Sequence, residues 1–112
     1  MLVEQALHYN NLNKGHGVVM DFQEKEASAW TKVGNQLMQE GMWKESSLAF
    51  YLAIDNLATL LSFYNVDASS LRLGDSVRTN ARAKANEIRT RIGELTQKAI
   101  EMNIKQIRAR SP

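Results

Sequence analysis

The stretch from Met42 to Tyr64 constrains the fold most, because its apolar residues cover most of the circumference of a helix. A helix of this kind is buried between neighbours rather than laid on a surface. One face carries Phe50, Ile54, Leu57, Leu61 and Tyr64, and Leu48, Ala49, Leu52, Ala53 and Leu60 extend the apolar surface around it. The sequence therefore predicts that residues 42–64 form the central helix of a bundle.

A shorter apolar stripe precedes this segment. Asp21 and Glu24 have the spacing of a capping box at a helix start, and Gly41 is placed to end that helix in a left-handed turn. Gly34 lies inside the helix, where glycine is unfavourable, and indicates a close contact with a neighbouring helix. The stripe comprises Ala27, Trp30, Val33 and Leu37.

A long basic helix is predicted after a turn at residues 65–70, with Asp67 or Ser69 as its cap. It runs from about Leu71 to Arg108. From Ile88 onward, successive apolar residues are alternately four and three positions apart. So narrow a stripe is typical of a helix at the edge of a bundle. Its seam comprises Val77, Ala81, Ile88, Ile92, Leu95, Ala99 and Met102.

The expected architecture is therefore all-α, an antiparallel three-helix bundle with a short extra N-terminal helix. A length of 112 residues fits one domain. Residues 1–20 are expected to form the short helix and a loop, because His8 to Gly17 is rich in Asn and Gly, and residues 21–112 to form the bundle. No alternating pattern predicts a strand.

Charge is divided unevenly along the chain. Residues 1–67 carry four lysines and eight acidic residues, whereas residues 68–112 carry ten basic and four acidic ones. Nucleic-acid binding by this basic half is one alternative, although aromatic residues for base stacking are not interleaved with it. A solvated basic face is another. The basic side chains in question are Arg72, Arg78, Arg82, Lys84, Arg89 and Arg91.

Catalytic chemistry has little support in this sequence. The two histidines, His8 and His16, lack the spacing of a metal-binding pair on a helix, and neither a phosphate-binding loop nor a nucleophile elbow is present. Asp55, inside the apolar helix, is expected to point outward. The chain has no cysteine. We expect no enzyme activity, cofactor or metal, and the lack of 18 continuous apolar residues predicts no membrane span.

Two helical families resemble residues 27–100. Trp30, Val33, Gly34, Leu37, Phe50 and Ala53 match the spacing of one tetratricopeptide repeat, with Ser46 at its small-residue position. The closer resemblance is to the microtubule-interacting and trafficking (MIT) domain, whose second helix opens with Gly, an aromatic residue and two charges. The matching positions are Gly41, Trp43, Lys44, Glu45, Phe50, Ala53, Ile54 and Leu57, then Lys84, Glu87, Arg91 and Leu95 in the third helix. Ser46, Ser47 and Ala49 depart from this pattern.

The resemblance implies a protein–protein adaptor in membrane trafficking or autophagy that binds a short helical or extended tail motif beside its third helix. Arg78, Arg82, Ala85 and Arg89 share a helix face that would admit an acidic, leucine-containing motif. The expected location is cytoplasmic, with a nuclear location or recruitment to endosomal membranes as alternatives. A helical dimerisation module is also open, because Ile100, Ile104 and Ile107 continue an apolar row suited to a homodimer.

Overall fold

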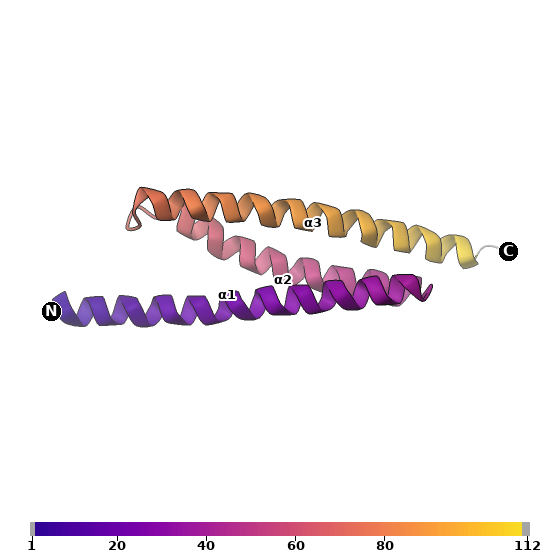
Figure 1. Cartoon of the computed structure of the whole chain (residues 1–112), viewed down its shortest axis with the longest axis horizontal. Helices are drawn as coiled ribbons and strands as arrows, with labels where there is room; N and C mark the ends of the chain where they lie inside the picture. The colour runs from indigo at the N-terminus through magenta and orange to yellow at the C-terminus, as the bar shows by residue number, and fades with distance from the viewer. Residues whose placement is uncertain (1, 111–112) are drawn as a thin grey trace.

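Three long helices make up the protein (Figure 1). The computed structural model describes the backbone of residues 2–110 and the side chains of residues 17–110. The helices are α1 (Leu2–Gln39), α2 (Trp43–Ser69) and α3 (Asp75–Arg110), and the described backbone contains no strand. The predicted all-α class is confirmed. The molecule is long and thin, with extents of 71 × 21 × 16 Å.

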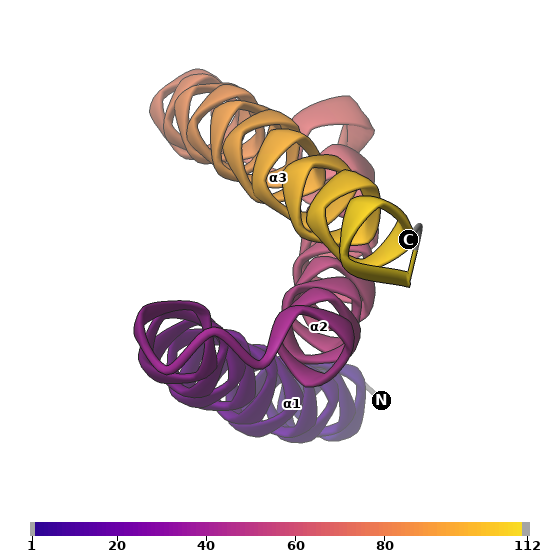
Figure 2. The same cartoon turned by 90° about the vertical axis from the view of Figure 1, so that its right-hand side faces the viewer.

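Helix α2 lies between the other two, and α1 and α3 pack on different sides of it (Figure 2). Side-chain hydrogen bonds give the chain direction. Ser47 bonds to Asn103 near the start of α2, and Asn65 bonds to Arg89 near its end. The residue numbers of the bonding partners on α3 fall as those on α2 rise, so these two helices are antiparallel. This places α2 as the predicted central helix and α3 at an edge.

The turn between α1 and α2 depends on Gly41. Its φ of 76° lies in the left-handed region, which only glycine enters without strain. The amide of Gly41 donates to the carbonyl of Met38 at 3.2 Å, and that of Met42 donates to Leu37 at 3.0 Å. These two bonds are those of a Schellman motif. The predicted left-handed end of the first helix is confirmed.

The core lies along the faces that α2 turns toward its two neighbours. It contains Ala27 from α1, Phe50, Ala53, Leu57 and Leu60 from α2, and Ile88, Leu95, Ala99 and Met102 from α3. Ile54 and Ile92, expected in the core, are partly buried against it. Of the predicted α1 stripe, Trp30 also packs there, whereas Val33 is 41% exposed.

Gly34 lies where α1 and α2 approach each other closely. A Cβ atom at this position would lie 2.5 Å from Cε1 of Phe50, whose ring is fully buried. The buried hydroxyl of Ser46 donates to the carbonyl oxygen of Gly34 at 2.8 Å. The close helix contact predicted from Gly34 is confirmed, and Ser46 adds a hydrogen bond that an alanine could not.

The prediction for residues 1–20 is wrong in its secondary structure. Helix α1 begins at Leu2 and continues to Gln39, so the chain has no loop at residues 8–17 and no helix start at Asp21. Asn and Gly lower helix propensity without forbidding a helix. The Asp21–Glu24 spacing matched a capping box by chance, inside a continuous helix.

The boundary between α2 and α3 also differs from expectation. Helix α2 continues to Ser69, through the residues predicted to turn, and α3 begins at Asp75 instead of Leu71. Val77 was expected in the seam but is 49% exposed. The antiparallel register places Val77 beyond the end of α2, where no helix covers it.

Helix α2 is long and apolar enough to cross a membrane if length and composition alone are considered. The sequence-based criterion of 18 continuous apolar residues did not flag it. A core helix can pass the same composition test; α2 contributes Phe50, Ala53, Leu57 and Leu60 to the core, and 39% of its most apolar window is buried.

Candidate binding groove

A groove of about 490 Å³ lies between α1 and α3, on one side of α2. We call it the α1–α3 groove. From α1 it is lined by Ser28, Thr31, Lys32, Asn35, Gln36 and Gln39, and from α3 by Arg91, Glu94, Leu95 and Lys98. Leu95 is the only aliphatic residue among these ten, and it is 6% exposed. The groove is therefore lined mainly by polar and charged residues, whose carbon atoms also form part of its surface.

The helical register explains why polar residues face each other here. Ser28, Thr31, Asn35 and Gln39 recur at spacings of three and four, so they form one stripe along α1. That stripe lies beside the apolar face that packs on α2. Arg91, Glu94 and Lys98 form the equivalent stripe on α3. Because α1 and α3 both direct their apolar faces at α2, their polar stripes line the groove between them.

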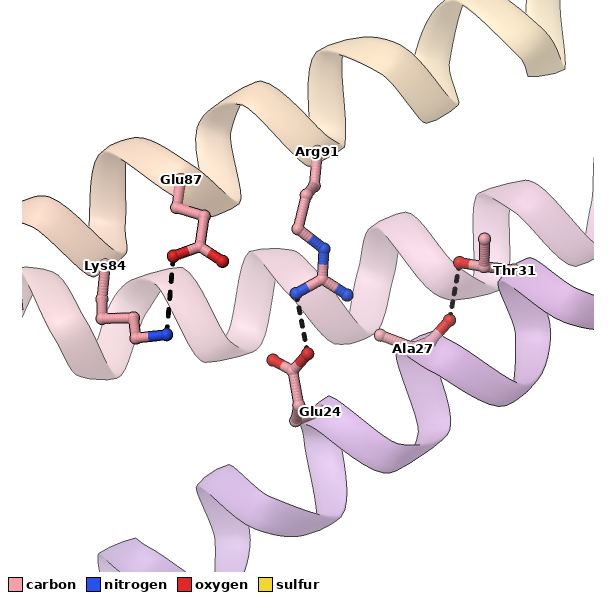
Figure 3. Close-up of polar contacts among 6 residues, drawn as sticks. All are labelled: Glu24, Ala27, Thr31, Lys84, Glu87 and Arg91. Carbon is pink, nitrogen blue, oxygen red and sulfur yellow. Dashed lines mark hydrogen bonds and ion pairs between the residues drawn. The ribbon is translucent and has the colours of Figure 1, made fainter.

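Two polar contacts join α1 and α3 across this space. Nη1 of Arg91 lies 2.7 Å from Oε1 of Glu24 in an ion pair (Figure 3). Nζ of Lys98 donates to Oδ1 of Asn35 at 3.2 Å and also lies 5.8 Å from the ring centroid of Phe50. The side chains of the ion pair remain partly exposed, at 30% for Arg91 and 47% for Glu24. Solvent, or a ligand, can therefore compete for these contacts.

Hydrogen-bond donors outnumber acceptors in the α1–α3 groove. Lys32, Arg91 and Lys98 are cationic, and Glu94 is the one acidic lining residue. The hydroxyl of Thr31 already donates to Ala27 of its own helix at 2.7 Å (Figure 3). A matching ligand must therefore supply acceptors, such as carboxylates and peptide carbonyl groups.

The predicted partner-binding face, Arg78, Arg82, Ala85 and Arg89, is not one open surface. Ala85 is buried at 1% exposure, so it cannot receive a partner between the arginines. Arg78 pairs with Asp75. Arg89 donates to Asn86 and, across the interface with α2, to Asn65. Arg82 is exposed. The prediction of an exposed Ala85 is wrong, because a small side chain on a helix fits a buried position as well as a surface one.

The wider basic set is also largely engaged within the molecule. Lys84 lies 3.5 Å from Glu87 (Figure 3), and Arg91 pairs with Glu24. Among the described side chains, only Arg72 and Arg82 of the six basic residues lack a polar partner. These six residues therefore do not present a row of free cations.

Sequence reasoning did not identify the α1–α3 groove. Lys32, Asn35 and Lys98 were not candidates, and Arg91 was named within the basic set and among the positions that resemble the third helix of the MIT domain, but not as a groove residue. A usable signal existed: the polar stripe on α1 lies next to an apolar one, and Arg91 and Lys98 are seven residues apart. What the sequence could not supply was the pairing of these two stripes, because it depends on how α1 and α3 sit on α2.

The predicted self-association residues lie where they were expected, near the end of α3. Ile100, Ile104 and Ile107 are 49%, 43% and 65% exposed. A second hollow of about 320 Å³ lies at the far end of α2, lined by Thr59, Ser62, Phe63, Val66 and Asp67. Asp55 is exposed, as predicted.

Within residues 17–110, no three His, Cys, Asp or Glu side chains gather as metal ligands would. His8 and His16 lie outside the described side chains. Comparison with protein-family models, with curated proteins and with solved structures finds no match. The function must therefore be argued from the groove itself.

Proposed function

We propose that this chain is a protein-interaction module that binds an acidic segment of a partner protein in the α1–α3 groove. One observation carries the proposal: the groove is open and is lined by Lys32, Arg91 and Lys98, against the carboxylates of Glu94 in the lining and of Glu24, which pairs with Arg91. The resemblance to the MIT domain supports the same class of function, an adaptor that recognises a short motif beside its third helix. The location in the groove replaces the arginine face first expected.

The lining favours an extended or polar segment over an apolar helix. A helix docked in a groove gains its affinity from apolar anchors at i, i+3 and i+4. Leu95 is the sole aliphatic residue available, and it is nearly buried. Amide side chains such as Asn35, Gln36 and Gln39 instead suit hydrogen bonds with an exposed peptide backbone. The acidic part of the expected motif therefore fits this groove better than its leucine.

Nucleic-acid binding is the weaker alternative. Phosphate contacts need exposed cations along a surface, and four of the six basic residues first considered have polar partners within the chain. The aromatic residues are concentrated on α1 and α2. Phe50 is fully buried, and Nζ of Lys105 already lies 4.7 Å from the centroid of the Trp43 ring, so neither ring is a free platform for base stacking.

Selection from a random peptide library on the immobilised protein tests the proposal. We expect enrichment of Asp- and Glu-rich peptides. The double variant Arg91→Glu, Lys98→Glu should bind a selected peptide about tenfold or more weakly, because it reverses both groove cations on α3. The matched control, Arg82→Glu with Arg89→Glu, makes the same change in net charge outside the groove and should retain binding.

Two outcomes would reject the groove as the binding site. One is no enrichment of acidic peptides over the starting library. The other is equal loss of binding in the groove variant and in its charge-matched control. Tight binding of arbitrary duplex DNA that weakens steeply with salt, without a peptide response, would favour the nucleic-acid alternative.

A further inference from the structure

Five exposed apolar side chains lie on the outer side of α2 and α3, near the turn between α1 and α2. We call them the outer patch: Leu48 and Tyr51 on α2, with Ile100, Ile104 and Ile107 on α3. Leu48 is 60% exposed and Tyr51 40%. Exposed apolar side chains gathered on one side of a molecule mark an interaction site more often than isolated ones do.

Hydrogen bonds between α2 and α3 hold the two halves of the outer patch together. The hydroxyl of Ser47, next to Leu48, lies 2.8 Å from Oδ1 of Asn103. Nδ2 of the same Asn103, which lies between Ile100 and Ile104 on α3, donates to the Tyr51 hydroxyl at 3.2 Å. Both ends of the Asn103 amide are thus bonded to α2. The surface left for a partner is mainly apolar.

The outer patch faces away from the α1–α3 groove. Successive residues of a helix are rotated by about 100° about its axis. Lys98 and Ile100 are two positions apart, so their side chains point to nearly opposite sides of α3. Lys98 lines the groove, and Ile100 belongs to the outer patch. Occupation of one site therefore leaves the other accessible, and the outer patch can bind a partner whether or not the groove holds a ligand.

The charges around the outer patch indicate what covers it. Six exposed charged residues lie three or four positions from a residue of the outer patch and therefore adjoin it on the helix surface. They are Lys44, Glu45 and Asp55 on α2 and Glu101, Arg108 and Arg110 on α3. Three are basic and three acidic, so the rim is neutral and carries both signs.

A rim with both signs complements a copy of itself. In a two-fold dimer the same patch occurs on both subunits, so each basic rim residue must find an acidic one on the other copy. A strongly acidic or basic partner would instead be opposed by half of this rim. We propose that the outer patch binds a second copy of this chain, forming a two-fold dimer whose centre is apolar.

Sedimentation equilibrium over a concentration series tests this dimer. The full chain should associate, and Leu48→Glu or Ile104→Glu should each raise the dissociation constant by about tenfold or more, since two-fold symmetry introduces each charge twice. Val66→Glu is the matched control, because Val66 is 64% exposed on the same helix but at its far end. It should leave the dissociation constant unchanged. Circular dichroism verifies that each variant remains helical.

Exchange of the rim charges tests self-complementarity separately. The acidic-rim variant, Lys44→Glu with Arg108→Glu, and the basic-rim variant, Asp55→Lys with Glu101→Lys, should each dimerise weakly alone. Mixed together they should form a heterodimer about tenfold or more tighter than either homodimer. A monomeric wild type at high concentration, equal weakening by Val66→Glu, or no preference for the mixed pair would each overturn the proposal.

Discussion

The packing of α2 on its neighbours differs in kind from the approach of α1 to α3. Around α2, contacts are apolar and close: Phe50 fills the space that Gly34 leaves, and Leu57 is fully buried. Across the α1–α3 groove, the contacts are one ion pair and one hydrogen bond, both partly exposed. The two regions share the same three helices but have different chemistry.

This difference separates what holds the fold from what is available to a ligand. Burial of apolar surface dominates stability, whereas partly exposed ion pairs contribute little. The helix positions are therefore determined by α2, and Arg91 and Lys98 can exchange their partners without loss of the fold. Four substitutions test this separation, in order of decreasing effect.

Leu57→Ala should have the largest effect. Leu57 is at 0% exposure in the core, so truncation removes apolar contacts and leaves a cavity. Unfolding in urea should show a loss of about 2–5 kcal/mol in the free energy of unfolding. The matched control is Leu48→Ala at a 60% exposed site of the same helix, which should cost much less. Equal costs would contradict the assignment of α2 as the core helix.

Gly34→Ala should come second. The added methyl group would lie 2.5 Å from the Phe50 ring, which the core prevents from moving freely. We expect a net loss of about 1–3 kcal/mol. Gly93→Ala is the control, since a Cβ at that exposed helical position meets no atom within 4 Å. It should stabilise the protein by up to about 1 kcal/mol. Stabilisation by both substitutions would refute the close α1–α2 contact.

Ser46→Ala should have a smaller effect. The Ser46 hydroxyl is buried and bonded to the Gly34 carbonyl, and its removal deletes one neutral hydrogen bond. Thermal or chemical unfolding should reveal a loss of about 1 kcal/mol. Ser62→Ala, at an exposed position of α2, should be neutral by comparison. A neutral Ser46→Ala would mean that this bond does not fasten α2 to α1.

Glu24→Gln should have the smallest effect on stability. It breaks the ion pair with Arg91, whose two side chains are partly exposed, so the expected loss is below about 1 kcal/mol. Binding of a selected acidic peptide should strengthen, because Arg91 no longer has a competing carboxylate. A loss comparable to that of Leu57→Ala would contradict the view that the groove contacts are dispensable for folding.

The fold was largely predictable because its determinants are local. Helical spacing identified the apolar faces, and Gly41 identified the turn, since a left-handed residue between two helical patterns is a specific signal. Helix ends were less predictable. The Asn- and Gly-containing segment of α1 remains helical, and α2 passes through its expected turn, because neither segment contains a residue that forbids a helix.

The candidate site was less predictable than the fold. Ala85 was expected on a binding face, yet it is buried, because one small residue on a helix does not reveal which neighbour covers it. Lys98 and Asn35 are 63 positions apart in sequence and meet only through the packing of two helices on a third. Such a pair is determined by tertiary structure. Ile100 and Ile104 are exposed because they lie on the outer side of α3, since α2 still covers Ala99 and Met102 in the same stretch.

Lys98→Gln gives the most direct test of the central claim, through two measurements on one variant. Lys98 lines the groove and bonds to Asn35, and glutamine retains hydrogen-bonding capacity without the positive charge. We expect the free energy of unfolding to change by less than about 1 kcal/mol. By titration calorimetry, the affinity for a selected acidic peptide should fall about tenfold. Unchanged affinity together with a large loss of stability would contradict the account, because it would make Lys98 part of the fold and not of a binding groove.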